Sequence, residues 1–220
     1  MVKVGVILSG CGVFDGAEIH ESVLTLLALS RAGAEVVCMA PNVDQLHVVD
    51  HRTGEATGET RNVLTESARI ARGEIVDIAE VSADELDAVI MPGGFGAAKN
   101  LCDFAVSGSD AKVQPDVGRL VTALLKAKKP IAALCIAPAA LAAICRDAGI
   151  ESSVTIGNEA GPAAGIEGMG IKHLECPVDE FRIDEANCLI TSPAYMLAGN
   201  IAEAAVGIEK TVAELLRMAG

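Results

Sequence analysis

Short apolar runs alternate with segments of helical periodicity along almost the whole chain, and this order limits the folds open to it. Continuous apolar runs occur at 4–8 (VGVIL), 35–41, 87–94 and 130–135. Short runs that are apolar throughout are typical of strands buried on both faces. Between them, apolar residues recur at helical spacing in the segments 19–33, 62–73, 115–129, 136–149 and 197–215. The alternation predicts an α/β protein with a mostly parallel sheet and helices on both faces.

The remaining segments predict smaller elements. We expect further strands at 47–51 and 153–158, and paired strands within 170–192 that turn near Asp184–Asn187. The stretch 95–114 is less regular and predicts a short helix or an insertion loop. Hydrophobic residues make up 51% of the chain and aromatic residues only 2%, so the core consists of Ala, Val, Ile and Leu. With no linker or repeat, the sequence predicts a single domain over 1–220.

Charge and cysteine usage bear on partners and compartment. The net charge of −13 repels phosphate backbones, so we expect no nucleic-acid partner. No apolar run approaches the length of about 18 residues that crosses a bilayer, so we expect no membrane partner either. Seven cysteines without a C-x-x-C pair predict reduced thiols, with no disulfide frame and no metal site. Because the first predicted strand begins at Lys3, which leaves no room for a targeting peptide, we expect a cytoplasmic protein; the alternative is an organelle, had a presequence been trimmed.

Cys135 stands where the strand 130–135 meets a helix that opens with Pro138, in the segment PIAALCIAPAAL. A nucleophile elbow has this layout, because its sharp turn holds one reactive side chain clear of the backbone. A thiol at a helix N-terminus ionises more readily, and the Ile136 amide could bind a developing oxyanion. The structural alternative is that Cys135 only fills the core, and position alone does not decide between the two.

Two glycine-rich turns follow other strands at the same predicted sheet edge. In MPGGFGAAKN, Gly93 and Gly94 let the backbone approach a ligand, and the Gly94 amide could complete an oxyanion pair with Ile136. SGCGVFDGAEIHES lies one residue off a dinucleotide fingerprint, and no acid ends the second strand. It also lacks the hydroxyl run of a flavin loop. We therefore expect it to deliver Glu21 to the site on a helix whose start Asp15 and Glu18 cap, although an acid there could merely favour the helix.

Taken together, GAEIHE, PGGFGAAKNL and ALCIAP make the chain resemble the ThiJ/PfpI superfamily of the class I glutamine amidotransferase-like fold. The segments GVILSGCGVFDGAEIHE and SPAYMLAGNIAEAA are most similar to its isoprenoid-biosynthesis glyoxalase-like branch, associated with enhanced lycopene biosynthesis. The resemblance implies a flavodoxin-like three-layer sandwich, a homodimer and no cofactor. It assigns Cys135 as nucleophile, Glu21 as its acid partner, and Gly94 and Ile136 as oxyanion amides. We expect the site to be lined by Gly12, His20, Gly93, Phe95 and Asn158.

The chain departs from its relatives in its histidines. The position that holds a histidine in the deglycase-like relatives is Gly157 or Asn158 here, and Ile136 follows the cysteine where other relatives have histidine. His173 and Glu175 resemble an H-x-E pair of glutamine amidotransferases. We place them on a strand of the terminal hairpin, outside the site.

The resemblance implies a glutathione-independent glyoxalase, a lyase that converts small reactive carbonyls such as glyoxal or methylglyoxal to hydroxy acids. Without a histidine base we expect weak activity. One alternative is a redox or stress sensor, linked to isoprenoid biosynthesis, in which Cys135 oxidises. Another is a glutaminase-like subunit, which requires a contact between Cys135 and a histidine.

Overall fold

A seven-stranded sheet runs through the centre of the molecule in the computed structural model, which describes residues 1–220. The strand order is β10-β11-β7-β6-β1-β2-β5, and only the β10–β11 pair is antiparallel. The strands of this sheet are β1 (Lys3–Ile7), β2 (Glu35–Ala40), β5 (Val76–Asp77), β6 (Ala88–Met91), β7 (Ile131–Leu134), β10 (Arg182–Asp184) and β11 (Leu189–Ser192). The mostly parallel sheet and the terminal hairpin are therefore as predicted.

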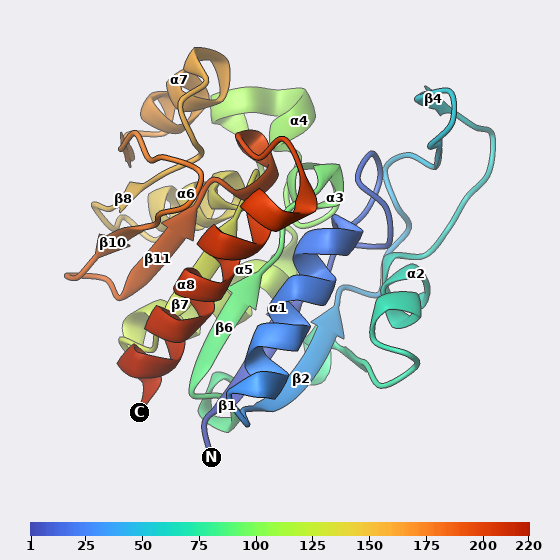
Figure 1. Cartoon of the computed structure of the whole chain (residues 1–220). Helices are drawn as coiled ribbons and strands as arrows, with labels where there is room; N and C mark the ends of the chain where they lie inside the picture. The colour runs from blue at the N-terminus through green and yellow to red at the C-terminus, as the bar shows by residue number, and fades with distance from the viewer.

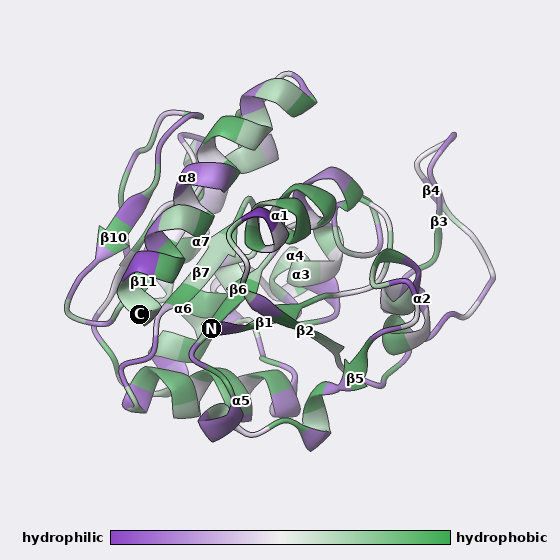
Figure 2. Ribbon diagram, turned by 60° about the horizontal axis from the view of Figure 1, so that its bottom comes forward, coloured by the Kyte–Doolittle hydropathy of each residue, from purple (hydrophilic) through white to green (hydrophobic).

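Helices cover both faces of this sheet (Figure 2). One layer contains α1 (Ile19–Arg31), α2 (Val63–Ile70) and α8 (Ile201–Ala219); the other contains α5 (Pro115–Lys126) and α6 (Pro138–Asp147). The strands join the layers because alternate side chains enter opposite cores: Ile131 and Ala133 pack toward α5 and α6, and Ala132 and Leu134 toward α8. The predicted three-layer α/β sandwich is confirmed.

The smaller elements lie outside the main sheet. The predicted strand 47–51 is only β3 (Val49–Asp50), which pairs with β4 (Glu55–Ala56) in a hairpin that projects from the body (Figure 1). The predicted strand 153–158 shortens to β8 (Ser153–Val154), which pairs in parallel with β9 (Lys172–His173). His173 thus lies beside β8, and its placement in the terminal hairpin was wrong. The irregular stretch contains the short helices α3 (Phe95–Lys99) and α4 (Phe104–Ser107), and α7 (Ala160–Gly168) precedes β9.

The order of the strands creates a switch point beside β1. The chain leaves β1 for β2 on one side and later returns to β6 on the other, so connections diverge from the carboxyl ends of β1 and β6. Open α/β sheets bind ligands at such a point. The segments after β1, β6 and β7 all end there, and they carry Glu21, Gly93 with Gly94, and Cys135.

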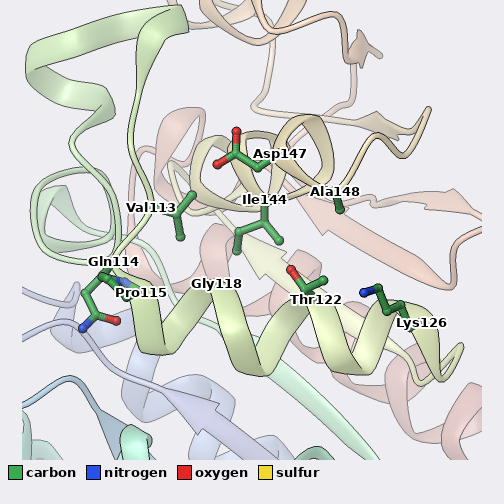
Figure 3. A pocket seen from close by; sticks show the side chains of 9 residues that line it. All are labelled: Val113, Gln114, Pro115, Gly118, Thr122, Lys126, Ile144, Asp147 and Ala148. Carbon is green, nitrogen blue, oxygen red and sulfur yellow. The ribbon is translucent and has the colours of Figure 1, made fainter.

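A separate groove of about 440 Å³ lies between α5 and α6 (Figure 3). Gly118 and Thr122 of α5 face Ile144 and Asp147 of α6 across it. It contains no cysteine or histidine. No helix of the structure is both long enough and apolar enough to span a bilayer.

Candidate active site

Cys135 occupies a sharp turn between β7 and α6. Its φ of 58° lies in the left-handed region, which is strained for a residue with a side chain. Its own amide donates to the carbonyl of Ser192 at 2.9 Å, and Pro138 opens α6 three residues later. The strand–turn–helix layout of a nucleophile elbow is therefore present. Cys135 as a residue is 7% exposed, and it lines a pocket.

Glu21 lies directly beside this thiol. It is completely buried in α1, and its side chain hydrogen-bonds that of Cys135. Its Oε2 accepts the Gly93 amide at 2.8 Å, and its Oε1 accepts the Tyr195 amide at 3.1 Å. Amides from two other segments therefore fix the carboxyl group against the sulfur.

The start of α1 differs from the predicted capping box. Glu18 itself is the N-cap, and its Oε2 accepts the Glu21 amide at 2.7 Å. Asp15 instead accepts the Val49 amide at 2.7 Å and so ties the loop after β1 to β3. The first helical turn therefore brings the Glu18 and Glu21 carboxyl groups to the same buried corner.

Burial dominates the titration of both candidate catalytic groups. It raises the pKa of Glu21 to about 7; the Tyr195 amide opposes this rise and the charge of Glu18 adds to it. Burial also raises the pKa of the Cys135 thiol well above its ordinary value, and the charge of Glu21 raises it further. The predicted ease of ionisation of Cys135 is therefore wrong, because loss of water outweighs the helix N-terminus. The raised pKa of Glu21 lets its carboxyl group carry a proton near neutral pH, as the expected role of acid partner to Cys135 requires.

The Gly94 and Ile136 amides both donate to the Cys135 sulfur and lower its pKa. Neither amide has another acceptor in the protein. Only glycine fits at position 94, where φ is 90° and a Cβ would stand 2.4 Å from the Glu18 nitrogen. The two amides are thus free to stabilise a thiolate, and their role toward an oxyanion stays a prediction.

A pocket of about 260 Å³ opens over Cys135. Apolar side chains form most of its wall, Glu18 and Glu159 supply carboxyl groups, and no lysine or arginine lines it. The lining residues are Val13, Glu18, Gly94, Phe95, Cys135, Ile136, Glu159, Pro162, Tyr195 and Met196.

The other predicted lining residues take different places. Gly93 lies beneath the pocket, where a Cβ would stand 2.4 Å from that of Cys135. His20 lies at the edge and reaches the pocket only through Tyr195. Gly12 packs against His51 instead, and the exposed Asn158 accepts the Cys176 amide at 3.0 Å.

Five lining residues have no prediction from the sequence: Val13, Glu159, Pro162, Tyr195 and Met196. Tyr195 and Met196 come three and four residues after the end of β11, so their position beyond the carboxyl end of a predicted strand could have indicated them. Glu159 and Pro162 belong to the segment of α7, which carries no such signal. For Glu18 the sequence indicates only a helix cap, whereas the structure also places it in the pocket wall.

No histidine contacts the candidate nucleophile. The side chain of His20 bonds Tyr195, that of His51 bonds the Phe14 amide, and that of His173 bonds the Ile156 amide. The fourth, His47, is exposed on the loop before β3. The hydrogen-bond partners of Cys135 are Glu21 and two backbone amides, so the contact required by a glutaminase-like subunit is missing. No three metal-binding side chains gather anywhere in the structure.

Comparison with known proteins finds a match over most of the chain. A model of the DJ-1/PfpI family matches residues 11–145. The human glutamine amidotransferase-like class 1 domain-containing protein 3, mitochondrial, is 47% identical over 99% of this chain and 84% of its own length. The rat ES1 protein homolog, mitochondrial, is 46% identical with the same coverage.

Solved structures agree with this result. The crystal structure of an isoprenoid biosynthesis protein with an amidotransferase-like domain from Ehrlichia chaffeensis covers 100% of both chains, with a TM-score of 0.93 and 37% identity. Drosophila melanogaster DJ-1beta covers 99% of this chain and 97% of its own, with a TM-score of 0.53 and 20% identity, and so shares the fold.

The predicted cytoplasmic location is wrong, because the human and rat relatives are both named as mitochondrial proteins. The prediction was based on the position of the first strand near the start of the sequence, and that position carries no information about the compartment of the mature protein. Reduced cysteines do not separate one reducing compartment from another, so the seven free cysteines gave no support to the cytoplasm over the mitochondrion.

Proposed function

Because the chain belongs to the DJ-1/PfpI family, we propose that it is a cofactor-independent glyoxalase-type enzyme that converts small α-oxoaldehydes to hydroxy acids. One observation carries the proposal: a buried carboxyl group, Glu21, hydrogen-bonds the only thiol that lines the pocket, Cys135. Glyoxal and methylglyoxal are the substrates to test first, because the pocket of about 260 Å³ admits only a small molecule beside the thiol.

The pair provides a nucleophile and a base that share one proton. The sulfur of Cys135 attacks the aldehyde carbon, and the proton held between Cys135 and Glu21 moves to the aldehyde oxygen. This leaves a hemithioacetal on Cys135 and an ionised Glu21 next to the carbon that must lose its hydrogen. A carboxyl group with a pKa of about 7 is well matched to accept that proton near neutrality.

The step that follows is an isomerisation and needs no oxidant. Glu21 removes the proton from the former aldehyde carbon and returns it to the neighbouring carbon, which converts the hemithioacetal to a thioester. Water then cleaves the thioester, releases the hydroxy acid and restores the thiol. The amides of Gly94 and Ile136, which donate to the sulfur, stabilise it as a leaving group.

Turnover of a panel of α-oxoaldehydes by purified protein tests this proposal. Cys135→Ser and Glu21→Gln should each abolish conversion to the hydroxy acid. Cys188→Ser is the matched control, because Cys188 also has a left-handed backbone, with φ 57°, and lies outside the pocket. Full conversion by Cys135→Ser would refute the mechanism.

The rival proposal is a redox or stress sensor, for which the same thiol would oxidise to a sulfinate. Oxidation requires a thiolate, and the raised pKa of Cys135 disfavours that form. Mass spectrometry after mild peroxide separates the two functions. Stoichiometric oxidation at Cys135 alone would favour the sensor, and scattered oxidation of several cysteines would count against it.

A further inference from the structure

A tyrosine and a histidine form a hydrogen-bonded pair at the mouth of the pocket. The Tyr195 hydroxyl lies 2.8 Å from Nδ1 of His20, and the two rings are 5.7 Å apart. Tyr195 lines the pocket together with Cys135, whereas His20 lies outside and is exposed to solvent. The pair therefore connects the interior of the pocket to bulk water.

Both members of the pair are held in place relative to Glu21. His20 precedes Glu21 in the first turn of α1, and the Tyr195 amide donates to Glu21 Oε1 at 3.1 Å. Tyr195 sits in a 3-10 turn (Ala194–Met196) just after β11, where Ala194 adopts φ 43°. A left-handed alanine is strained, and the surrounding structure must hold it there. This turn brings the Tyr195 ring to the pocket wall.

We propose that Tyr195 is the acid–base catalyst for the two substrate oxygens, and that His20 is a positioning residue that holds the phenol and exchanges its proton with solvent. This inference rests on the proposed glyoxalase function and assigns a further catalytic residue to it. The isomerisation moves two protons, one between carbons and one between oxygens. Glu21 lies at the sulfur and moves the proton between the carbons, so the proton that moves between the oxygens needs a different acid–base group.

The proton balance closes with Tyr195 in this role. When Glu21 removes the proton from the first carbon, electrons move onto the ketone oxygen, and the Tyr195 hydroxyl donates its proton there to give an enediol. Glu21 then returns its proton to the second carbon. The hydroxyl on the first carbon loses its proton to the Tyr195 phenolate as the thioester carbonyl forms. Both side chains end in their starting states, and nothing is oxidised or reduced overall.

The surroundings of the phenol suit this role. Burial raises the pKa of Tyr195, and the charges of Glu18 and Glu21 raise it further, so the resting hydroxyl carries its proton. His20 supplies the contact with water that the buried Glu21 lacks. The pair thus supplies an acid–base group and a histidine at a pocket where no histidine contacts Cys135.

Isosteric and rescue variants test the assignment on the full chain. Tyr195→Phe keeps the ring and the amide that holds Glu21, and should lower kcat for methylglyoxal by about 100- to 10,000-fold with KM unchanged. The rate at which iodoacetamide alkylates Cys135 should stay at the wild-type value, which shows that the pocket and thiol are intact. A purely structural role for Tyr195 would change this rate and KM as well.

His20→Ala should show a smaller loss in kcat, and free imidazole should restore it by occupying the space beside the phenol. Imidazole should not restore the double variant His20→Ala/Tyr195→Phe, which has no hydroxyl to relay. His47→Ala is the matched control, because His47 is also exposed but has no side-chain partner, and it should leave kcat unchanged.

The outcomes separate this inference from the function on which it rests. Wild-type kcat in Tyr195→Phe, with Cys135→Ser inactive, would overturn the role of Tyr195 and leave the glyoxalase proposal standing. A slow His20→Ala that imidazole does not restore would overturn the role of His20. Absence of turnover by the wild type, with Cys135 still open to alkylation, would refute both proposals.

Discussion

At the scale of single residues, the site depends on two acidic groups competing for one proton. Glu21 is completely buried, and each of its oxygens accepts a backbone amide. Those bonds favour the ionised carboxylate, but burial costs more and sets the direction of the pKa. Because the charge of Glu21 also raises the pKa of the Cys135 thiol, small changes around either group alter the chemistry of both.

The raised pKa of Glu21 predicts how stability depends on pH. The value is about 7 in the folded protein against 4.5 for an ordinary glutamate, so the folded state binds this proton more tightly than the unfolded state. The stability gained is fully present below the unfolded pKa and is lost as pH rises through the folded pKa. We expect a loss of about 3 kcal/mol in the free energy of unfolding between mildly acidic and mildly alkaline buffer, measured by urea denaturation.

Glu21→Gln provides the control for that measurement, because an amide cannot titrate in this range. Its unfolding free energy should fall less between the two buffers, and the difference from the wild type isolates Glu21. Parallel pH profiles for the two proteins would contradict the raised pKa.

The close packing around Gly93 predicts that a side chain at this position would disturb the Cys135–Glu21 pair. A Cβ at this position would stand 2.4 Å from the Cys135 Cβ, 2.8 Å from Glu21 Oε2 and 2.9 Å from the Leu134 carbonyl oxygen. Gly93→Ala must therefore separate the thiol from the carboxyl group, and should cost about 1–3 kcal/mol in stability together with most of the turnover. Gly58→Ala, where a Cβ meets nothing within 4 Å, should change neither. Thermal unfolding measures the loss of stability, and the glyoxal assay measures the loss of turnover.

The sequence predicts those parts of the site that local patterns indicate. Cys135 and Glu21 stand at strand–helix junctions, so the sequence signals both, although not that Cys135 would be difficult to ionise. That property depends on burial, which comes from packing across the whole chain. The Tyr195 amide donates to Glu21, which lies 174 residues away in the sequence, and no local pattern indicates such a contact.

At the scale of elements, the first turn of α1 has two roles. Glu18 caps the helix by accepting the Glu21 amide, and its charge also raises the pKa of Glu21. The same carboxyl group lines the pocket. Stability of the helix and acidity of the site are therefore linked through one side chain.

Two substitutions at Glu18 separate these roles. Glu18→Ala removes the cap and should lower the free energy of unfolding by about 1 kcal/mol, measured in urea. Glu18→Gln keeps an oxygen for the Glu21 amide but removes the charge, so stability should hold while the pKa of Glu21 falls. Carbon-detected NMR titration of the Glu21 carboxyl group measures that shift, and an unchanged pKa in Glu18→Gln would exclude the charge of Glu18 as a cause.

The long elements were predictable and the short ones were not. Continuous apolar runs identified β1, β2, β6 and β7 because these strands are covered on both faces. The segment of α7, AGPAAGIEG, contains three glycines and a proline and no apolar periodicity, so tertiary contacts must stabilise that helix. β8 was recognised as a strand, but its partner β9 lies outside the main sheet, and a strand's own residues do not report which strand it pairs with.

At the scale of the whole molecule, α1 and α8 pack side by side on one face of the sheet (Figure 1). Ile19, Val23 and Leu27 recur one turn apart along α1 and remain exposed, as does Ile201 on α8. Apolar residues that gather on an exposed helix face are typical of interaction surfaces. The homodimer that the family resemblance implies would cover this face.

Negative charges introduced on the exposed face of α1 should therefore dissociate the two chains of the predicted dimer. The test variant carries Val23→Glu and Leu27→Glu, two substitutions at exposed positions of α1; Val23 is 50% exposed. This variant should run as a monomer in size-exclusion chromatography with light scattering. Leu46→Glu is the control, because Leu46 is about as exposed but belongs to the loop before β3 and not to α1 or α8, and this variant should keep the mass of two chains. A monomeric wild type would contradict the predicted dimer.

The left-handed backbone at Cys135 has a consequence for how the chain would evolve. Any residue with a Cβ loses about 1–2 kcal/mol at this φ, and glycine would avoid most of that loss. Selection for stability alone would thus favour replacing the whole side chain of Cys135, including its Cβ, with a hydrogen atom. A population freed from the need for this thiol should accumulate glycine there and gain heat resistance as its activity disappears.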